Sequence, residues 1–557
     1  MGLIVSLFTE HLSYFHPEVE GLAVHGASLS TAALLQRCAR DPELEALEVF
    51  LPPQLMAKPA ALAEAARNLL GGRAGQGFLR FHPVHALPEI WADRLPRILL
   101  GIDPETMPQL RYLRDRFASG PMAICCDTHT GESQSLIAAL TRMASAAPVA
   151  YDAVVCVSAP YQQFMRTLVA GVTPVGGEPP FRLELIPRAV DIERFQPVDA
   201  DGRQQARRLL GLPERGRIAL CFGRLTAYTK ADLLPLIEAF CAASRSDDHL
   251  LFAGREYPSG YAALLREAGA ELGHRLIIRG EASPSLRPLY YAASDLFVQP
   301  GDSVIEAFGN TVLESMACGL PVIASDWVGF RDLVEPGVSG ILVPTWWMPG
   351  LDRISALSPL AQRNADHLYT GQSLWLDAPA LTAALRDVLS TSNETRAAMG
   401  SAGRRIAEGF RPDLVHRRWR RLWAMQLAEA TAEPPSAAER RRAGADRLGL
   451  PSRYLDWFAH YATGVIGPNH RFRLNERGRT VAVRARPVRF YDDLLPLIHR
   501  EIIDALFAVL SDQRDWATCQ ELVKGAADRC ARAPDDIRFH LGLLLKRGLL
   551  DAAPPTT

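Results

Sequence analysis

The sequence predicts an α/β protein with two doubly wound, Rossmann-like domains and an additional small α+β domain. Short apolar runs alternate with helical patterns over residues 1–195, and a second series of the same kind begins after about Asp199. Buried parallel strands are near-continuous apolar runs, and strands that alternate with helices are typical of doubly wound sheets. Two such series indicate two domains that face one another.

The strands expected in each half follow from these apolar runs. The first half contributes 3–8, 47–51, 123–126 and 153–157. The second contributes 218–222, 250–253, 276–278, 296–298 and 321–325. We therefore expect one domain over residues 1–197 and a second over 198–430. Within the second, 344–374 is expected to be an inserted loop with a short helix, and a long helix is expected near 396–428.

Residues 448–552 follow a different pattern. Two alternating runs within 471–484 flank a turn that contains a glycine, which predicts a β-hairpin. Three helical patterns come after it, at 494–511, 517–528 and 534–547. A hairpin with three helices suggests a winged-helix-like module. The preceding residues 430–447 have the Pro-, Glu- and Arg-rich composition of a linker.

Composition limits the compartment and the class of partner. The formal net charge is −1, which argues against a general electrostatic attraction to nucleic acid or anionic membranes. The nine cysteines form no C-x-x-C pair, which fits buried free thiols in a reducing compartment. The N-terminus lacks a signal-peptide pattern, and no stretch reaches the roughly 18 apolar residues of a membrane span. These features predict a cytoplasmic protein.

Residues 301–326 contain the most informative motif. Glu306 and Glu314 stand eight residues apart. Asn310 is a good N-cap residue, so a short helix is expected to start at Thr311 and to carry Glu314 on its first turn. A carboxylate inside such a helix can accept two hydroxyl groups, as on a ribose.

The glycine within this motif points to a phosphate. Gly309 permits backbone N–H groups to approach a ligand closely at the positive end of the expected helix. Gly319 and Pro321 then end the helix, before an apolar strand. The whole arrangement suits a nucleotide that carries a polyol.

The run that starts at Glu306, Glu-Ala-Phe-Gly-Asn-Thr-Val-Leu-Glu-Ser-Met-Ala-Cys-Gly-Leu-Pro-Val-Ile-Ala-Ser, resembles a known signature. It is similar to the Glu-x7-Glu motif of retaining glycosyltransferases of the GT-B fold, most closely family 4. The resemblance extends over roughly residues 1–430. It implies a nucleotide-diphospho-sugar donor in a cleft between two Rossmann-like domains, with Glu306 beside the sugar and Glu314 on the ribose. Further donor contacts are implied for Phe308, Gly309, Asn310 and Thr311.

The same resemblance assigns two cations to the donor diphosphate. The segment 223–230 ends a strand and precedes a helix, and the matching family motif places an Arg and a Lys on the diphosphate. This implies Arg224 and Lys230, although the loop is one residue longer than the commonest family spacing. Two fixed cations can stabilise a leaving diphosphate without Mg²⁺, so no metal ion and no other cofactor are expected.

In the first half, the resemblance points to a histidine and a glycine. His129 follows the strand 123–126, where family members often carry a functional His, so it is expected to contact the donor sugar or the acceptor. Gly26 lies in the region where the family places a glycine-rich loop against the phosphates, although only one glycine is present here. Ser158 and residues 187–191 resemble hinge elements of the family.

Together these features predict a metal-independent, retaining glycosyltransferase of the hexosyltransferase type. No carboxylate is a convincing covalent nucleophile, which fits a front-face mechanism. The acceptor remains open: a glycan, a lipid-linked molecule, a small molecule or a peptide. The module at 448–552, which loosely resembles the recognition elements of enzymes that modify ribosomal peptides, could bind a peptide or a second copy of the chain. Nucleic acid is not expected, because few aromatic residues accompany the seven arginines of 471–489.

Three alternatives remain open. The first is a non-catalytic nucleotide-sugar-binding scaffold that keeps the GT-B shape. Another is a glycosyltransferase that modifies a peptide or protein recruited by the C-terminal module. The third is a relative of glycogen- or trehalose-type synthases or of phosphorylases, although no motif for a phosphorylase-type cofactor lysine is evident.

Overall fold

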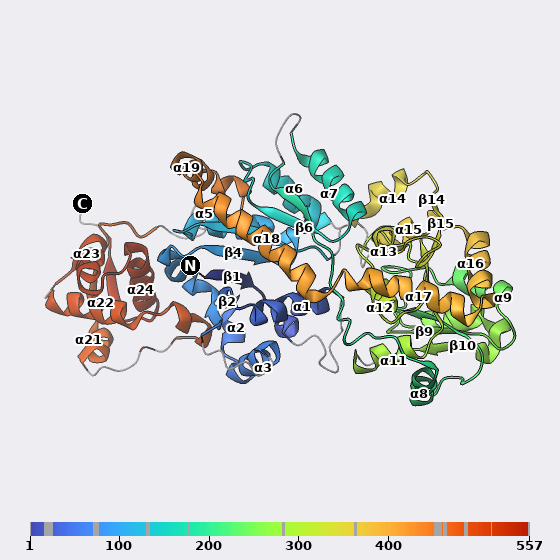
Figure 1. Ribbon diagram of the computed structural model, residues 1–557. Helices are drawn as coiled ribbons and strands as arrows, with labels where there is room; N and C mark the ends of the chain where they lie inside the picture. The colour runs from blue at the N-terminus through green and yellow to red at the C-terminus, as the bar shows by residue number, and fades with distance from the viewer. Residues whose placement is uncertain are drawn as a thin grey trace. The chain divides into compact units, whose positions relative to one another are not determined.

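The computed structural model describes most of the chain (Figure 1). The described residues are 2–15, 26–70, 77–129, 134–174, 179–280, 284–360, 365–450, 459, 465–483, 488, 490–513 and 515–554. They form two compact units. Unit 1 comprises Met1–Leu51, Lys58–His82 and Leu87–Leu450, and unit 2 comprises Pro52–Ala57, Pro83–Ala86 and Pro451–Thr557.

The first sheet of unit 1 has seven strands in the order β3-β2-β1-β4-β5-β6-β7. The strands are β1 Leu3–Phe8, β2 Leu44–Leu51, β3 Leu79–Pro83, β4 Arg97–Gly101, β5 Met122–Cys126, β6 Ala153–Cys156 and β7 Arg182–Leu185. Chain order reverses between β1 and β4, the switch point at which doubly wound sheets bind ligands. All four predicted strands are confirmed, and β3, β4 and β7 were missed.

The second sheet has six parallel strands in the order β10-β9-β8-β11-β12-β13. They are β8 Ile218–Phe222, β9 His249–Ala253, β10 Leu276–Arg279, β11 Leu296–Gln299, β12 Val322–Ser325 and β13 Gly340–Val343. The five predicted strands are confirmed; β8, β9, β11 and β12 are buried throughout, whereas β10, at the edge of the sheet, is only half-buried. The switch point of this sheet lies between β8 and β11. The prediction of two doubly wound domains is therefore correct.

Helices cover both sheets. In the first domain they include α1 Gly26–Arg40, α3 Pro59–Leu70, α5 Met107–Phe117, α6 Gln134–Ala144 and α7 Ala159–Val172. In the second they include α8 Ala200–Leu210, α9 Leu234–Ala243, α10 Tyr261–Ala268, α11 Arg287–Ala292, α12 Asn310–Ala317, α13 Phe330–Leu333, α16 Ala378–Ser390 and α17 Asn393–Glu408. None of the helices in the described part of the chain has both the length and the apolar composition needed to span a bilayer.

The insertion after β13 is more regular than predicted. Instead of a loop it contains a two-stranded antiparallel sheet, β14 Thr345–Trp347 paired with β15 Leu374–Leu376. Two short helices, α14 Asp352–Leu357 and α15 Ala365–Gly371, connect the two strands. The alternation of apolar residues in such short strands is too brief to be recognised from the sequence.

The long helix predicted near 396–428 is two helices, because Pro412 starts a new one. After α17, helix α18 runs from Pro412 to Thr431, crosses back and packs on β5 of the first sheet (Figure 1). The side-chain amide of Gln426 on α18 donates to the carbonyl oxygens of Ile124 and Tyr151, at 2.9 and 2.8 Å. This helix therefore belongs to the core of the first domain.

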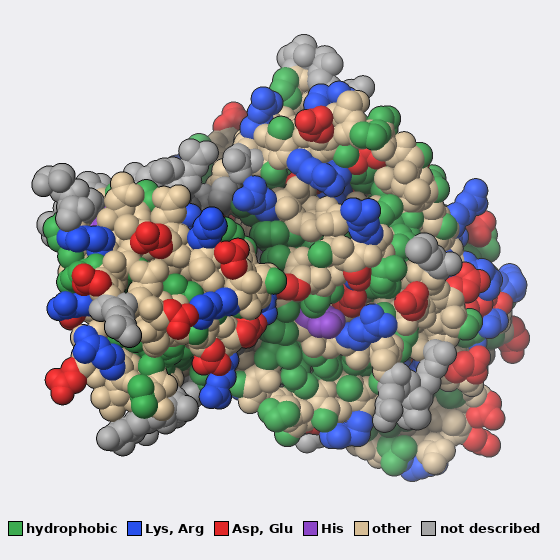
Figure 2. All heavy atoms as spheres, turned by 90° about the vertical axis from the view of Figure 1, so that its left-hand side faces the viewer, with side chains coloured by type: hydrophobic (Ala, Val, Ile, Leu, Met, Phe, Trp, Pro, Cys, Tyr) green, Lys and Arg blue, Asp and Glu red, His purple; other side chains and the backbone are tan. Residues whose placement is uncertain are grey.

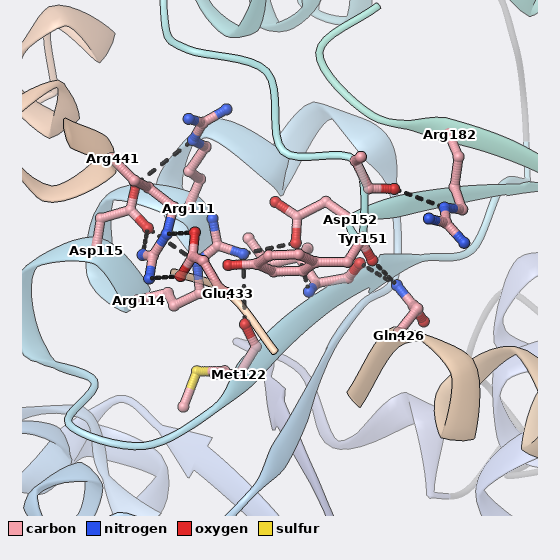
Figure 3. A network of polar contacts seen from close by, with 12 residues as sticks. Arg111, Arg114, Asp115, Met122, Tyr151, Asp152, Arg182, Gln426, Glu433 and Arg441 are labelled. Atoms are coloured by element: carbon pink, nitrogen blue, oxygen red, sulfur yellow. Dashed lines mark hydrogen bonds and ion pairs between the residues drawn. The ribbon is translucent and has the colours of Figure 1, made fainter. Parts of the chain in front are cut away.

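The predicted linker 430–447 is not a linker. Pro435–Ala443 form helix α19, and a 3₁₀ turn follows at Ala445–Leu448. Arg441 of α19 donates to Glu433 at 3.0 Å and forms an ion pair with Asp115, as Figure 3 shows. Composition alone suggested a solvated segment. Long-range charge pairing instead holds it against α5, so that unit 1 ends at Leu450.

Unit 2 has its own apolar core and a three-stranded antiparallel sheet in the order β17-β16-β18. Its strands are β16 Arg471–Leu474, β17 Ala517–Thr518 and β18 Leu550–Ala553. The three predicted helices are confirmed as α22 Arg500–Asp512, α23 Cys519–Cys530 and α24 Pro534–Lys546. The side chain of Thr518 and that of Glu521 form a capping box at the start of α23.

The hairpin predicted at 471–484 is wrong. Its first run forms β16, but Glu476–Val483 form helix α21, and β16 pairs with two strands that are distant in sequence. Asn475 explains the difference, because its side-chain oxygen accepts the N–H of Gly478 at 2.9 Å and so caps the helix. Residue 484, the last of the second predicted run, lies outside the described residues.

Charge on the surface is mixed. On the face drawn in Figure 2, basic and acidic side chains are intermingled, in keeping with a formal net charge of −1. The described residues of that face therefore offer no broad field of one sign to a polyanion.

Candidate nucleotide-sugar site

The predicted donor residues of the second domain lie at one edge of its sheet. Arg224 and Lys230 follow β8, and Glu306 follows β11, the neighbour of β8. Because parallel strands end at the same edge, these side chains lie at the carboxyl side of the switch point. Ligands of doubly wound sheets bind in this crevice.

Lys230 and Glu306 contact each other directly. The Lys230 ammonium donates to Glu306 Oε2 at 2.7 Å, and the Phe308 N–H lies 3.4 Å from Glu306 Oε1. Burial raises the pKa of Glu306, but the Lys230 charge and these hydrogen bonds outweigh it and hold the pKa below its usual value. The carboxylate is therefore ionised at neutral pH. The sequence assigned the two groups to different parts of the donor and did not predict this pair.

Arg224 is a half-buried cation close to the donor turn. Within the described residues its guanidinium makes no hydrogen bond or ion pair, and burial lowers its pKa although the charge of Glu306 raises it. Gly254 permits a close approach to the backbone next to Arg224, because a Cβ at position 254 would lie 1.8 Å from the carbonyl oxygen of Gly223. A desolvated cation with unused donors suits an anionic ligand.

Helix α12 begins one residue earlier than predicted. Asn310 is its first residue, and the cap is Gly309, whose φ is +107° and whose added Cβ would lie 2.6 Å from the ring of Phe330. Glu314 therefore lies just beyond the first turn. The first intrahelical bond runs from Leu313 to Gly309, at 3.0 Å, so the N–H groups before it have no intrahelical acceptor. These donors fit the predicted phosphate contact.

Glu314 is held by two residues of α11 that the motif does not reveal. Its Oε1 accepts from Arg287 at 2.5 Å, and its Oε2 accepts from the Tyr291 hydroxyl at 2.8 Å. Arg287 and Tyr291 are four residues apart and so share a helix face, but nothing in the sequence links that face to Glu314. Each carboxylate oxygen keeps a second lone pair, and the ribose role of Glu314 stays a prediction.

The other residues predicted to contact the donor differ in which of their groups a ligand could reach. The Phe308 ring is buried, with its centroid 6.1 Å from that of Phe410, so only its backbone is free to contact a ligand. Asn310 and Thr311 are half-buried, and the Thr311 hydroxyl accepts from Gln299 at 3.3 Å. Gly26, predicted to lie in a loop, is instead the first residue of α1.

His129 lies at the end of β5, with Arg188 against its ring. Arg188 Nη2 is 2.8 Å from Nδ1, and because a guanidinium only donates, Nδ1 accepts and the proton lies on Nε2. Nε2 lies 3.2 Å from the Thr31 hydroxyl. Burial, and then the Arg188 charge, lowers the pKa of His129 to about 4, although Asp127 raises it. The partners of His129 in the described chain belong to the first domain, and Arg188, predicted only as a hinge residue, positions it.

Acidification is expected to destabilise the fold through His129. The unfolded residue has a pKa near 6.5 and the folded one about 4, so below about pH 6.5 only the unfolded state takes up this proton. Stability therefore falls as the pH falls, by up to about 3 kcal/mol for a difference of this size. Urea denaturation between pH 7.5 and 4.5 should show a steeper loss for the wild type than for His129→Gln. The exposed His11→Gln should follow the wild type, and parallel curves for His129→Gln would contradict the expectation.

Ser158 joins the first domain to the Glu306 turn. Its hydroxyl donates to the Ala307 carbonyl oxygen at 2.7 Å and accepts the Tyr161 N–H at 3.3 Å, which caps α7. One residue further on, the Ala159 N–H donates to Asp332 at 2.6 Å. The predicted hinge position is thus a contact between the two domains of unit 1.

The described residues contain no group of three or more His, Cys, Asp or Glu side chains that could hold a metal ion.

Part of the second domain resembles known glycosyltransferases in sequence. Residues 216–348 match the family model of glycosyl transferases group 1. D-inositol 3-phosphate glycosyltransferase from Thermobispora bispora is 36% identical over 207 residues, which are 34% of this chain and 47% of that protein. The enzyme of the same name from Salinispora tropica is 35% identical over 214 residues, 33% of this chain and 43% of that protein. The chain thus spans less than half the length of these curated relatives.

Solved structures show the same fold at low sequence identity. Sucrose-phosphate synthase from Thermosynechococcus elongatus has a TM-score of 0.51 and 18% identity, over 77% of this chain and 100% of that one. Anabaena HepE in complex with UDP and glucose has a TM-score of 0.50 and 16% identity, over 76% and 99%. The chain therefore has the GT-B fold of two Rossmann-like domains, and residues 216–348 of its second domain are similar to glycosyl transferases group 1.

Proposed function

We propose that the protein is a retaining, metal-independent glycosyltransferase that moves a sugar from a nucleotide-diphospho-sugar to an acceptor hydroxyl or amine. The observation that carries the proposal is the set Arg224, Lys230 and Glu306 at the switch-point edge of the sheet that bears the family match. Glu314 on helix α12, held by Arg287 and Tyr291 of α11, completes this set.

The side chains suggest how transfer proceeds. The bond from the anomeric carbon to the diphosphate oxygen breaks, and charge grows on that oxygen, where Arg224, Lys230 and the N-terminus of α12 can stabilise it. Glu306 would accept sugar hydroxyls and orient the ring. The acceptor attacks from the same side, and its proton passes to the leaving diphosphate. No covalent enzyme intermediate is needed.

Lys230 has a second role in this mechanism. It is paired with Glu306, so a diphosphate that binds Lys230 weakens that pair and leaves Glu306 free to accept a sugar hydroxyl. Donor binding would in this way prepare the carboxylate for the sugar. A non-catalytic scaffold has no need of this coupling, which favours the enzyme.

A peptide or protein acceptor is the second candidate. Unit 2 has its own core, and β18 stands at the edge of its sheet, where an extended peptide can add as a strand. In this variant of the proposal unit 2 recruits the acceptor, and the donor residues keep the roles given above.

The two glutamates offer the sharpest test. UDP-, GDP- and ADP-sugars are first screened by thermal shift, with UDP-glucose as the first donor and D-inositol 3-phosphate as one of the acceptors. Glu314→Gln should then weaken binding of the bare nucleoside diphosphate about 10- to 100-fold in calorimetry, the scale of hydrogen bonds to a charged group. Glu306→Gln should lower kcat with little change in that affinity.

Two controls accompany this test: a surface variant that should leave the donor site unaffected, and an experiment that tests whether a metal ion is needed. Glu238→Gln, on the exposed face of α9, should behave as the wild type. Turnover should also survive EDTA. If none of the nucleotide sugars stabilises the wild type, the proposed function is wrong. If Glu306→Gln binds the diphosphate worse than Glu314→Gln, the two roles are reversed.

A further inference from the structure

The hairpin β14–β15 presents two tryptophans to solvent side by side. Trp346 and Trp375 are directly opposite in the antiparallel register, so their side chains project from the same face. They are 59% and 50% exposed. Large aromatic side chains gathered on an exposed face usually mark a binding site, because the fold itself gains little from them.

The other face of the hairpin is anchored in the second domain. Leu374 and Leu376 are buried, and the ring of Trp347 lies edge-on to Trp327, with centroids 5.6 Å apart. Packing of the two leucines and the contact of Trp347, which is still 44% exposed, with Trp327 therefore hold the hairpin in place. This packing does not explain the outward pair Trp346 and Trp375.

The hairpin is joined to the donor turn through Trp327. The indole N–H of Trp327 donates to the Ser303 carbonyl oxygen at 3.0 Å, and the same oxygen accepts the Glu306 N–H at 3.2 Å. One carbonyl thus ties together the aromatic anchor of the hairpin and the residue expected to orient the donor sugar.

A second connection comes from the end of the insertion. Gln372 lies just before β15, and its side-chain amide donates to Asp232 Oδ2 at 3.1 Å. The N–H of Asp232 in turn lies 3.2 Å from the carboxylate of Asp302, four residues before Glu306. The insertion is therefore fixed to the donor turn at two points.

Topology places the hairpin at the ligand edge of the sheet. It begins directly after β13, whose neighbour β12 is followed by Trp327, and β11 comes next. The carboxyl ends of these parallel strands share one edge. The hairpin therefore flanks the proposed donor site on the side away from β8 to β10.

We propose that the face formed by Trp346 and Trp375 binds a neutral sugar ring of the acceptor. This rests on the proposed function and specifies its acceptor as a saccharide. The C–H face of a pyranose stacks on an indole, which combines a large apolar area with low conformational entropy. The hairpin strands carry no charged residue, and the nearby Arg331 and Asp326 neutralise each other in an ion pair at 2.7 Å.

Charge is the reason to prefer a saccharide over a membrane. Surfaces that lie on anionic bilayers combine apolar side chains with Lys and Arg, which the two strands lack. A neutral polyol needs no such cations.

The test uses the full-length protein on an array of neutral and charged oligosaccharides, followed by titration with the neutral saccharide that binds best. Trp346→Ala and Trp375→Ala should each weaken that binding about tenfold or more. Trp346→Phe, which keeps an aromatic face, should recover part of it. Affinity for UDP and the melting temperature should stay unchanged. Phe539→Ala, an exposed aromatic of unit 2, is the matched control.

The outcomes separate this inference from the proposed function. Absence of neutral saccharide binding by the wild type, or equal binding by the tryptophan variants, overturns the saccharide face. Loss of binding to phosphatidylcholine vesicles in the variants, with saccharide binding intact, assigns the face to a membrane instead. Saccharide binding that depends on both tryptophans, without binding of any nucleotide sugar, keeps the face and rejects the glycosyltransferase.

Discussion

Replacing Arg114 by methionine is expected to destabilise the first domain by about 3–5 kcal/mol, the cost of removing one partner of a buried ion pair. The Arg114 side chain is 1% exposed and lies between Asp115, at 2.9 Å, and Asp152, at 2.6 Å (Figure 3). Burial raises the pKa of Asp115, but Arg114, Arg441 and Arg111 outweigh it and keep the pKa below its usual value. The substitution leaves two buried carboxylates with less compensation.

Urea denaturation followed by circular dichroism measures this loss, as the shift in the midpoint of the first transition multiplied by its slope. Arg417→Ala is the matched control, because its side chain on α18 is 66% exposed and its ion pair with Asp413 lies on the surface. Exposed pairs of this kind contribute about 0–1 kcal/mol. If the two variants shift the midpoint equally, the buried network does not stabilise the domain.

Replacing Arg224 by alanine is expected to lower turnover about 10²- to 10³-fold, the scale for removal of one preorganised donor to a developing negative charge. The fold should remain intact, because within the described residues the guanidinium makes no hydrogen bond or ion pair. The loss should appear in kcat rather than only in KM, since the charge on the diphosphate grows as the sugar bond breaks.

Steady-state kinetics with the donor found by thermal shift provides the measurement. Arg208→Ala is the control: this arginine lies on α8 of the same domain, its side chain is 57% exposed, and its partner Glu214 is also exposed. Near-normal turnover by a folded Arg224→Ala protein would remove Arg224 from the diphosphate site.

Much of the fold could be predicted because buried parallel strands are locally distinctive. Runs such as Ala153–Cys156 and Ile218–Phe222 are apolar throughout, and nine strands of the two large sheets were predicted from such runs. The strand Arg97–Gly101 was not predicted, and it begins with a charged residue. That residue, Arg97, is buried against Glu48 at 3.0 Å, a partner 49 residues away.

In two segments the local sequence pattern led to a wrong prediction of the structure. The runs after Arg471 alternate as strands do, but the Asn475 cap turns the second into helix α21. The Arg-rich segment after Pro434 has the composition of a solvated linker, yet Arg441 finds Asp115 at a sequence separation of 326 residues. The Asn475 cap is local but competes with an alternating pattern, whereas Asp115 cannot be recognised from the sequence around Arg441.

The sequence by itself determined the two doubly wound domains, the three C-terminal helices and the placing of Arg224, Lys230 and Glu306 after strands of the second domain. Periodicity, caps and motifs are local, so they can be recognised without the fold. Only the tertiary structure decided that Lys230 pairs with Glu306, that Arg287 and Tyr291 hold Glu314, and that Trp327 joins the aromatic hairpin to the donor turn. These contacts depend on which elements pack together, and packing is set by the burial of apolar faces along the whole chain rather than by any one segment.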